Sequence, residues 1–359
     1  MKKTVALVLA LALCASLLSG CSADSGTQTP QGSQESAPAA TTPVATNPPA
    51  TGPAATEPAA TEPAATEPAA TEPPATPTTP ATTPPATTPP ATQPPVTAAP
   101  KPVSTEMPNG VFAYTYENSV MTIYGRGNLE KDALEACGAY DVLKSEAEVQ
   151  VVLTEGVTRI MYGVFKGCSA ITSVTIPEGV MSIKNSAFNE CSALTSIVIP
   201  EGVTEIGSGA FRDCSALTSV TIPGSVTEIG GVAFGGCKSL TSVTIPEGVT
   251  EIGAQTFEFC TALTSVTIPG SVTRIRDRAF NGCTALTSIV IPEGVTVIEG
   301  RAFTHCENLT SVTIPESVTE IRGNAFNGCT ALKSVTIPNP DTVIVPTAFG
   351  SSVTVKQGG

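Results

Sequence analysis

The chain has 359 residues, a formal net charge of −13, no tryptophan and one histidine. This acidic balance argues against nucleic acid as a partner, because neutralising phosphates requires a surface rich in Lys and Arg. It also disfavours direct binding to an anionic membrane surface, so any membrane attachment has to come from another feature of the chain.

The N-terminal segment, residues 1–20, is typical of a secretory signal peptide. Lys2 and Lys3 precede an apolar run that is too short to span a bilayer comfortably. The run ends in Leu18-Ser19-Gly20-Cys21, which resembles the lipobox of bacterial lipoproteins. The resemblance implies that Cys21 carries diacylglycerol and anchors the protein to a membrane that it does not span. The alternative is an ordinary signal peptide followed by an incidental cysteine.

Residues 21–104 form a linker rich in Pro, Thr and Ala. Between Ser22 and Pro102 there is no Leu, Ile, Met or aromatic residue, and a Thr-Glu-Pro-Ala-Ala pentad repeats from Thr56 onwards. Such a composition cannot bury enough apolar surface to offset the entropy of ordering, so we expect a disordered, extended stalk. The threonines could carry O-glycans, and recognition of the tract by a domain that binds Pro-rich ligands is the alternative role.

Residues 105–150 are expected to cap the repeats that follow. Two alternating runs, 111–116 and 120–124, predict a β-hairpin. Residues 129–142 have helical character after Asn128, a candidate N-cap. Cys137 is expected to be a buried thiol of this cap, because it lies outside the spacing of the later cysteines.

Residues 151–350 contain about nine units of 23 residues, and residues 351–359 form a C-terminal strand and tail. Fixed repetition at this period predicts a solenoid in which each unit stacks on its neighbours. Within one unit, the alternation at 220–222 predicts a strand that Pro223 ends. The predicted inward-facing side chains of that unit are Leu217, Val220, Ile222, Val226, Ile229, Ala233, Phe234 and Cys237. The regular columns predicted to form the core ladder include Cys191, Cys214, Cys237, Cys260, Cys283, Cys306, Phe211 and Phe234.

The repeated pattern Cys-x-x-Leu-x-x-Val-x-Ile-Pro-x-x-Val-x-x-Ile-x-x-x-Ala-Phe resembles the BspA-like, Treponema-type leucine-rich repeats of bacterial and protist surface proteins. The resemblance implies a β-rich, curved, right-handed solenoid with a parallel sheet on its concave face and short helical or 3₁₀ turns. It also implies roles in adhesion and in binding proteins of a host or a neighbouring cell. The unit departs from ordinary leucine-rich repeats because it lacks their asparagine ladder.

The cysteine column is expected to consist mainly of buried thiols, with disulfides between adjacent turns as the minority alternative. Strand spacing places the Cα atoms within disulfide range, but stacked side chains point in parallel, which suits that bond poorly. We expect no metal site and no cofactor, because the chain has no Cys-x-x-Cys pair and no histidine column.

Partner contacts are predicted where one unit differs from the next. Glu205, Glu228 and Glu251 occupy one column, and positive charge follows in the C-terminal half. The candidate partner-contact residues are Phe259, Arg274, Arg276, Arg278, Arg301, His305 and Arg322. Ordinary variation of a solvated surface is the alternative. The outward Ser and Thr columns of the sheet form a second candidate surface for an extended partner.

The sequence therefore predicts a lipid-anchored protein on the outer face of the cell envelope that binds an extracellular protein or glycan. No nucleic-acid partner and no enzymatic activity are expected, because no catalytic motif is present. A monomer is favoured. The alternatives are a self-associating structural protein of the envelope and a dedicated glycan-binding module.

Overall fold

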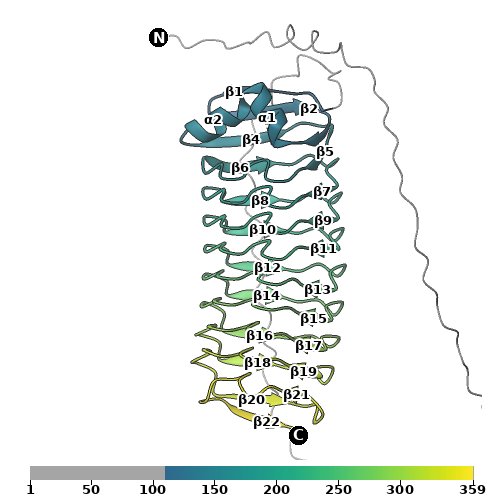
Figure 1. Cartoon of the computed structure of the whole chain (residues 1–359), viewed down its shortest axis with the longest axis vertical. Helices are drawn as coiled ribbons and strands as arrows, with labels where there is room; N and C mark the ends of the chain where they lie inside the picture. Colours follow the sequence, from purple (N-terminus) through teal and green to yellow (C-terminus); the bar gives the residue numbers. More distant parts are fainter. Residues whose placement is uncertain (1–109, 359) are drawn as a thin grey trace, which may run out of the picture. The chain divides into compact units, whose positions relative to one another are not determined.

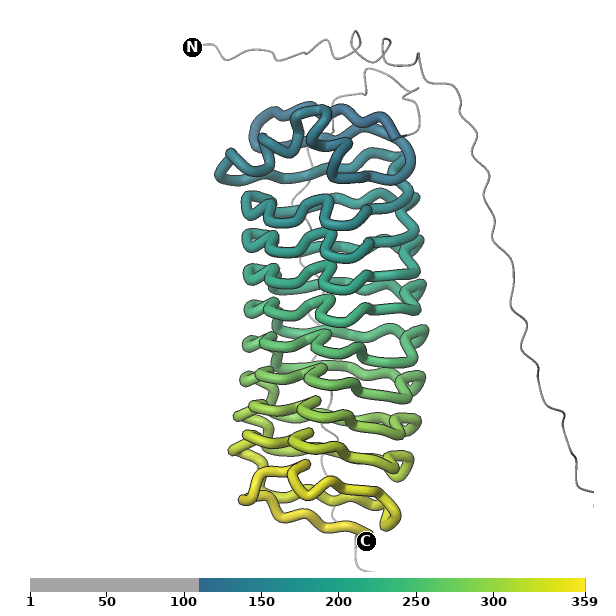
Figure 2. Tube along the Cα trace, in the orientation of Figure 1, coloured from purple at the N-terminus to yellow at the C-terminus, as the bar shows by residue number. Residues whose placement is uncertain are grey.

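The structure is a computed structural model that describes residues 110–358. These residues form a β-solenoid of about nine turns with parallel sheets and two short helices, stacked as a column (Figures 1 and 2). The predicted signal peptide, the predicted lipidation site Cys21 and the predicted linker lie outside the described residues. No helix within residues 110–358 is both long enough and apolar enough to cross a membrane.

The cap contains the predicted hairpin, formed by β1 (Phe112–Glu117) and β2 (Val120–Gly125). Asn118 and Ser119 both have positive φ, at 50° and 64°, which is the turn geometry that matches the twist of hairpin strands. The chain continues through β3 (Gly127–Leu129), α1 (Lys131–Cys137) and α2 (Ala139–Ser145).

The prediction that Asn128 caps a helix is wrong. Asn128 lies in β3 and pairs with Arg159 of the first turn, while Glu130 occupies the N-cap position of α1 without a side-chain capping bond. Gly138, with φ of 82°, divides the predicted helix into α1 and α2. Cys137 is half-buried rather than buried.

Each turn contributes one strand to each of two parallel ladders. The first ladder contains β4 (Val149–Leu153), β6 (Ile171–Thr175), β8 (Ser196–Val198), β10 (Ser219–Thr221), β12 (Ser242–Thr244), β14 (Ser265–Thr267), β16 (Ser288–Val290), β18 (Ser311–Thr313), β20 (Ser334–Ile337) and β22 (Thr354–Gln357). The second contains β5 (Val157–Ile160), β7 (Ser182–Ile183), β9 (Glu205–Ile206), β11 (Glu228–Ile229), β13 (Glu251–Ile252), β15 (Arg274–Ile275), β17 (Val297–Ile298), β19 (Glu320–Ile321) and β21 (Val343–Ile344).

The first ladder joins the cap where β4 pairs with β2, and Thr154, which replaces the proline found in later turns, extends this pairing. The Thr154 amide and hydroxyl both donate to the carbonyl oxygen of Ile123 in β2, each at 3.1 Å. Proline has no amide hydrogen and could not make the first of these bonds. The departure from the repeat therefore adds to the attachment of the cap to the solenoid.

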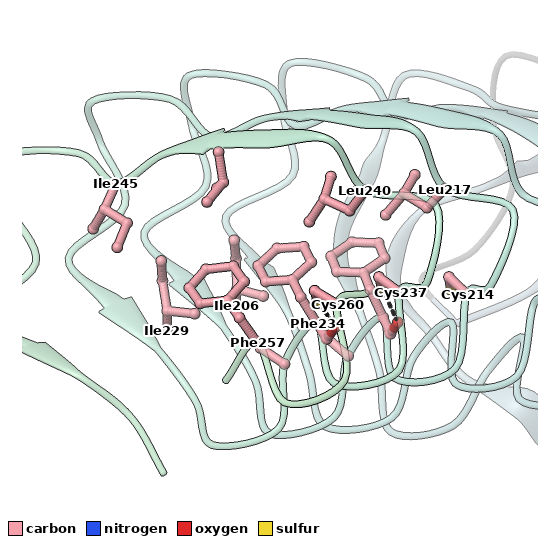
Figure 3. Packing of buried hydrophobic residues seen from close by; sticks show 14 of the residues in the cluster. Ile206, Cys214, Leu217, Ile229, Phe234, Cys237, Leu240, Ile245, Phe257 and Cys260 are labelled. Carbon is pink, nitrogen blue, oxygen red and sulfur yellow. Dashed lines mark hydrogen bonds between the residues drawn. The ribbon is translucent and has the colours of Figure 1, made fainter. Parts of the chain in front are cut away.

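The core is built around a column of phenylalanine rings between the two ladders (Figure 3). From Phe165 to Phe349 the ring centroids of neighbouring turns lie 5.1–5.6 Å apart, with interplanar angles of 3–16°. Leu217, Leu240 and their equivalents complete each layer and are fully buried. One turn could not bury such a ring alone, so each turn is stabilised by packing against the turns next to it.

Two of the eight predicted inward side chains, Val220 and Ile222, are only partly buried. The equivalent Val243 in the next turn is 4% exposed. This difference follows from the pairing of turns along the first ladder. In the described residues β8 pairs with β10, β12 with β14, and β16 with β18, whereas β10 and β12 do not pair, nor do β14 and β16.

A serine bridges the two turns of each pair. The hydroxyls of Ser225, Ser271 and Ser317 donate to the carbonyl oxygens of Val203, Val249 and Val295, at 2.7, 2.8 and 2.8 Å. These serines recur two turns apart, at positions where the alternate turns have glycine. The structural unit of this part of the solenoid is therefore a pair of 23-residue turns.

Candidate binding surfaces

The outer face of the first ladder, here called the hydroxyl face, consists of the outward side chains of β8 to β20. Its two columns of outward side chains are in register within each pair of turns, as Ser242 and Thr244 are with Ser265 and Thr267. The outward side chains of these strands carry no charge, although the chain as a whole is strongly acidic. Val290, which replaces threonine, is 64% exposed. The face offers hydroxyls and methyl groups at the strand spacing of ~4.8 Å.

A neighbouring threonine column has a structural role. The hydroxyl of Thr218 donates to Thr195 O at 3.0 Å, and that of Thr264 donates to Thr241 O at 3.0 Å. Equivalent bonds run along the corner before the first ladder. These hydroxyls satisfy backbone carbonyl oxygens of the preceding turn, in a repeat that lacks the asparagine ladder of ordinary leucine-rich repeats. Because they already donate to backbone carbonyls, these hydroxyls are not counted as part of the hydroxyl face.

The predicted arginine ridge is tied to the protein's own carboxylates. Arg276 Nε donates to Glu251 Oε2 at 2.7 Å, and Arg274 Nη1 donates to Glu299 Oε1 at 3.0 Å. Arg322 Nε donates to Glu320 at 2.9 Å and its Nη1 lies 3.6 Å from Glu299. The Arg322 hydrogen bond lowers the pKa of Glu320.

Of the other two arginines in the ridge, Arg278 lies 3.4 Å from Asp277, and Arg301 is exposed at a corner. The structure thus brings Arg274, Arg276 and Arg322 into one ion-pair network, whose positive charge is largely compensated. The ridge as a partner-contact surface remains a proposal.

Phe259 and His305 occupy the left-handed region, with φ of 57° and 56°. Each ring lies over the glycine at the same position of the next turn. A Cβ built on Gly282 would be 2.6 Å from the Phe259 ring, and one on Gly328 would be 2.6 Å from His305 Nδ1. As expected from the sequence, the turn between the two residues has Gly282 at the equivalent position. The Phe259 side chain is 51% exposed.

The cysteine column consists of free, buried thiols in the described residues. Each thiol from Cys191 to Cys329 donates a hydrogen bond to the carbonyl oxygen of the phenylalanine one turn earlier, at 3.1–3.2 Å. Burial raises the pKa of Cys168 to about 11 and the pKa of Cys214 and Cys260 to about 12. Such thiols are poor nucleophiles and metal ligands, because both roles need the thiolate. Within residues 110–358 no group of three or more His, Cys, Asp or Glu could hold a metal ion.

Two hollows lie in the cap, where the sequence suggested no site. The larger, of about 800 Å³, is lined in part by Arg126, Glu130, Glu155 and Arg159. The smaller, of about 390 Å³, is lined by Lys131, Tyr140, Lys144, Tyr162, Gly163, Lys166, Gly167 and Glu190. One sequence signal could have pointed to the smaller hollow. Tyr162 stands where the later units have only Asn, Ser, Gly, Ala, Asp or Pro.

The stacked turns, paired ladders and phenylalanine column define a leucine-rich-repeat solenoid. The family of BspA type leucine rich repeat regions matches residues 144–263 and 250–357, in six copies, over more than half of the chain. The protein therefore belongs to the BspA-type leucine-rich repeat family.

Among solved structures, a leucine-rich repeat protein of Bacteroides ovatus is 27% identical, with a TM-score of 0.52 over 71% of this chain and 72% of that one. The leucine-rich repeat protein of T. pallidum is 25% identical over 63% of this chain and 90% of its own, with a TM-score of 0.43. A leucine-rich cell surface protein of Faecalibacterium prausnitzii is 24% identical over 71% and 96%, with a TM-score of 0.36. No curated protein matches the chain.

Proposed function

We propose that this protein is a lipid-anchored protein of the cell surface that binds an extracellular protein or glycan through its solenoid. The observation that carries the proposal is the hydroxyl face, which stays uncharged from β8 to β20 of an acidic protein, with its strands in register within each pair of turns. A flat surface of this kind fits an extended partner better than a small molecule, which needs unlike groups converging in a pocket. The lipobox-like sequence before Cys21 supports the anchor, and family membership supports a surface role.

The anchor is tested in a bacterial host with the full-length chain. Metabolic labelling with a fatty-acid analogue should mark the wild-type protein and leave Cys21→Ala unlabelled. The wild-type protein should remain in the membrane fraction, and external protease should digest it on intact cells. An equally labelled Cys21→Ala protein would overturn the assignment of the lipid to Cys21.

The binding surface is tested with the full-length protein in detergent on an array of matrix proteins and glycans. Thr244→Arg and Thr313→Arg place a long cation on the hydroxyl face, and we expect each to weaken binding to the retained partner at least tenfold. Asn327→Arg introduces the same side chain at an exposed corner away from this face and serves as the control. Unchanged binding by both threonine variants would exclude the hydroxyl face as the site.

Light scattering on the same preparation addresses the structural alternative. A monomer that binds an array partner supports the proposed function. Concentration-dependent self-association that Thr244→Arg abolishes would instead favour a protein whose faces pair with each other.

A further inference from the structure

The smaller cap hollow combines cationic and aromatic side chains from three separate segments. Its lining comes from α1 and α2, from the corner at 162–167, and from Glu190 of the next turn. Both helices lie at the end of the stack that contains β4 and β6 (Figure 1). We propose that this hollow binds a carboxylate-bearing sugar, a uronic or sialic acid residue of an extracellular glycan.

The local charge is opposite to that of the protein as a whole. Lys131, Lys144 and Lys166 line one hollow with Glu190, and Glu135 pairs with Lys131, so three ammonium groups stand against two carboxylates there, whereas the chain carries a net charge of −13. An ammonium cluster on an acidic protein attracts an anionic group to this place and not to the rest of the surface. The hollow therefore selects an acidic ligand over a neutral one.

Tyr140 holds the lysines in place. The Nζ atoms of Lys131 and Lys144 lie 4.9 and 5.4 Å from the centroid of the Tyr140 ring. The Tyr140 hydroxyl donates to Lys166 O at 3.1 Å, and Lys144 Nζ donates to Gly167 O at 2.8 Å. These contacts position the ammonium groups of Lys131 and Lys144 before a ligand arrives, which reduces the entropy lost on binding.

The lysines keep donors for a ligand. Lys131 Nζ forms an ion pair with Glu135 at 2.8 Å, and Lys144 Nζ contacts two backbone carbonyls. An ammonium group has three N–H donors, so each of these lysines retains at least one for a carboxylate oxygen. Lys166 is exposed beside them. A bound carboxylate can therefore receive charge-assisted hydrogen bonds from more than one side.

Tyr162 supplies the apolar contact that distinguishes a sugar from a simple anion. Its side chain is 67% exposed, and the fold does not need an aromatic residue there, because the equivalent positions in later turns carry small side chains. An exposed ring has an apolar face, and one face of a pyranose presents C–H groups that can stack on it. Glu190 can accept hydrogen bonds from sugar hydroxyls.

The size of the hollow agrees with this ligand. A volume of about 390 Å³ falls within the range of ligand pockets, roughly 300–1,000 Å³. The larger hollow, by contrast, sets Arg126 and Arg159 against Glu130 and Glu155. Its charges are balanced and its lining has no aromatic ring, so it lacks both features that mark the smaller one.

This inference rests on the proposed function only in requiring that the cap is displayed outside the cell. The hollow and the hydroxyl face have no residue in common. Loss of binding in Tyr162 variants and loss in Thr244→Arg therefore report on different sites, and one can fail while the other holds.

The test uses the full-length protein in detergent and isothermal titration calorimetry. The probes are an oligogalacturonate and its methyl ester, which differ only in the free carboxylates, and sialyllactose with lactose as its neutral counterpart. A sulfated galactan oligosaccharide separates carboxylate recognition from general anion binding. We expect at least one acidic carboxylate probe to bind at least tenfold more tightly than its neutral counterpart and than the sulfated one. Added salt should weaken the binding, because the lysines are exposed.

The variants test the contribution of the Tyr162 ring separately from that of the Lys166 charge. Tyr162→Asn introduces the residue of the next turn and should weaken binding at least tenfold, while Tyr162→Phe keeps the ring and should bind as the wild type does. Lys166→Gln should also weaken binding at least tenfold, and Lys238→Gln, at an exposed site three turns away, should not. All three positions are at the surface, and circular dichroism checks that each of the four variants is folded.

Three results would overturn the proposal. The first is that neither oligogalacturonate nor sialyllactose binds. The second is that the neutral or the sulfated probe binds as tightly as the carboxylate probe. The third is that Tyr162→Asn and Lys166→Gln bind as the wild type does.

Discussion

Cys237 Sγ donates a hydrogen bond to the carbonyl oxygen of Phe211, over 3.2 Å. The same oxygen accepts the backbone N–H of Cys214, also at 3.2 Å, so that three residues of two adjacent turns meet at one atom. Figure 3 shows Cys237 and Cys260 pointing into the core beside the phenylalanine rings. The thiol thus joins neighbouring turns through a hydrogen bond, and a disulfide would remove its donor.

Burial should make the thiol column unreactive in the native protein. At about pH 8, a thiol with a pKa of about 11, such as Cys168, is thiolate in only about one molecule in a thousand. We expect iodoacetamide to label the half-buried Cys137 faster than any cysteine of the column, and all of them to react rapidly in concentrated guanidinium chloride. Mass spectrometry of the peptides measures this. Native labelling of Cys214 at the rate of Cys137 would contradict it.

The same thiols should make the protein sensitive to alkali. Burial raises the pKa of Cys214 to about 12, above its ordinary value, so the folded state favours the neutral thiol. This contribution to stability is complete below the unfolded pKa and is lost as the pH rises towards 12. Between these values the free energy of unfolding should fall by about 1.4 kcal/mol per pH unit for each such thiol.

Cys214→Ala isolates this effect, because all other groups that titrate in alkali are shared with the wild type. The variant should be less stable near neutral pH, where it lacks the thiol hydrogen bond. Its stability should then fall less steeply above about pH 9, in line with the unfolded thiol pKa. Urea denaturation at a series of pH values gives both slopes, and identical slopes would disprove the linkage.

The serine bridges should contribute to stability only within a pair of turns. Ser271→Ala leaves the carbonyl oxygen of Val249 without the hydroxyl that it accepts at 2.8 Å. We expect a loss of about 1–3 kcal/mol in the free energy of unfolding. Ser265→Ala removes an exposed hydroxyl six residues away and should cost less than about 0.5 kcal/mol. Equal effects of the two substitutions on urea denaturation would show that the bridge has no special role.

The solenoid should open most readily between the turns that contain β11 and β13. At this junction both ladders are interrupted, since β10 and β12 are unpaired as well. Glu228 and Glu251 occupy equivalent positions on its two sides. Glu205 and Glu228 also lie opposite each other, in strands β9 and β11 that do pair, so repulsion between like charges does not by itself interrupt the ladder. Glu251 instead contacts Arg274 and Arg276 on its C-terminal side.

Hydrogen exchange tests this junction amide by amide. Thr273 N–H donates to Thr250 O at 2.8 Å and Arg276 N–H donates to Ile252 O at 3.0 Å, one turn further along. Within the described residues the equivalent amides of Thr250 and Gly253 make no such bond. We therefore expect Thr250 and Gly253 to exchange at least tenfold faster than Thr273 and Arg276. Equal protection from exchange at the four amides would show that the junction opens no more readily than the neighbouring junctions.

The candidate sites could be predicted from the sequence less completely than the fold. The arginines after residue 274 stood out as a charged group, but only the structure places Glu251, Glu299 and Glu320 within reach of them. The Tyr162 hollow was missed because its residues come from three segments. The N-cap prediction failed at Asn128 because pairing of β3 with the first turn outweighed a local capping preference.

The sequence alone determined the solenoid, the strand that precedes the proline in each turn, and the columns of Cys and Phe. These follow from a period that repeats the same buried side chains at the same places, so each turn can stack only on a copy of itself. The tertiary structure decided the pairing of turns, the half-burial of Val220, and the cluster of lysines around Tyr140. These depend on contacts between residues of different turns or of the cap, which a periodic pattern within one turn does not specify.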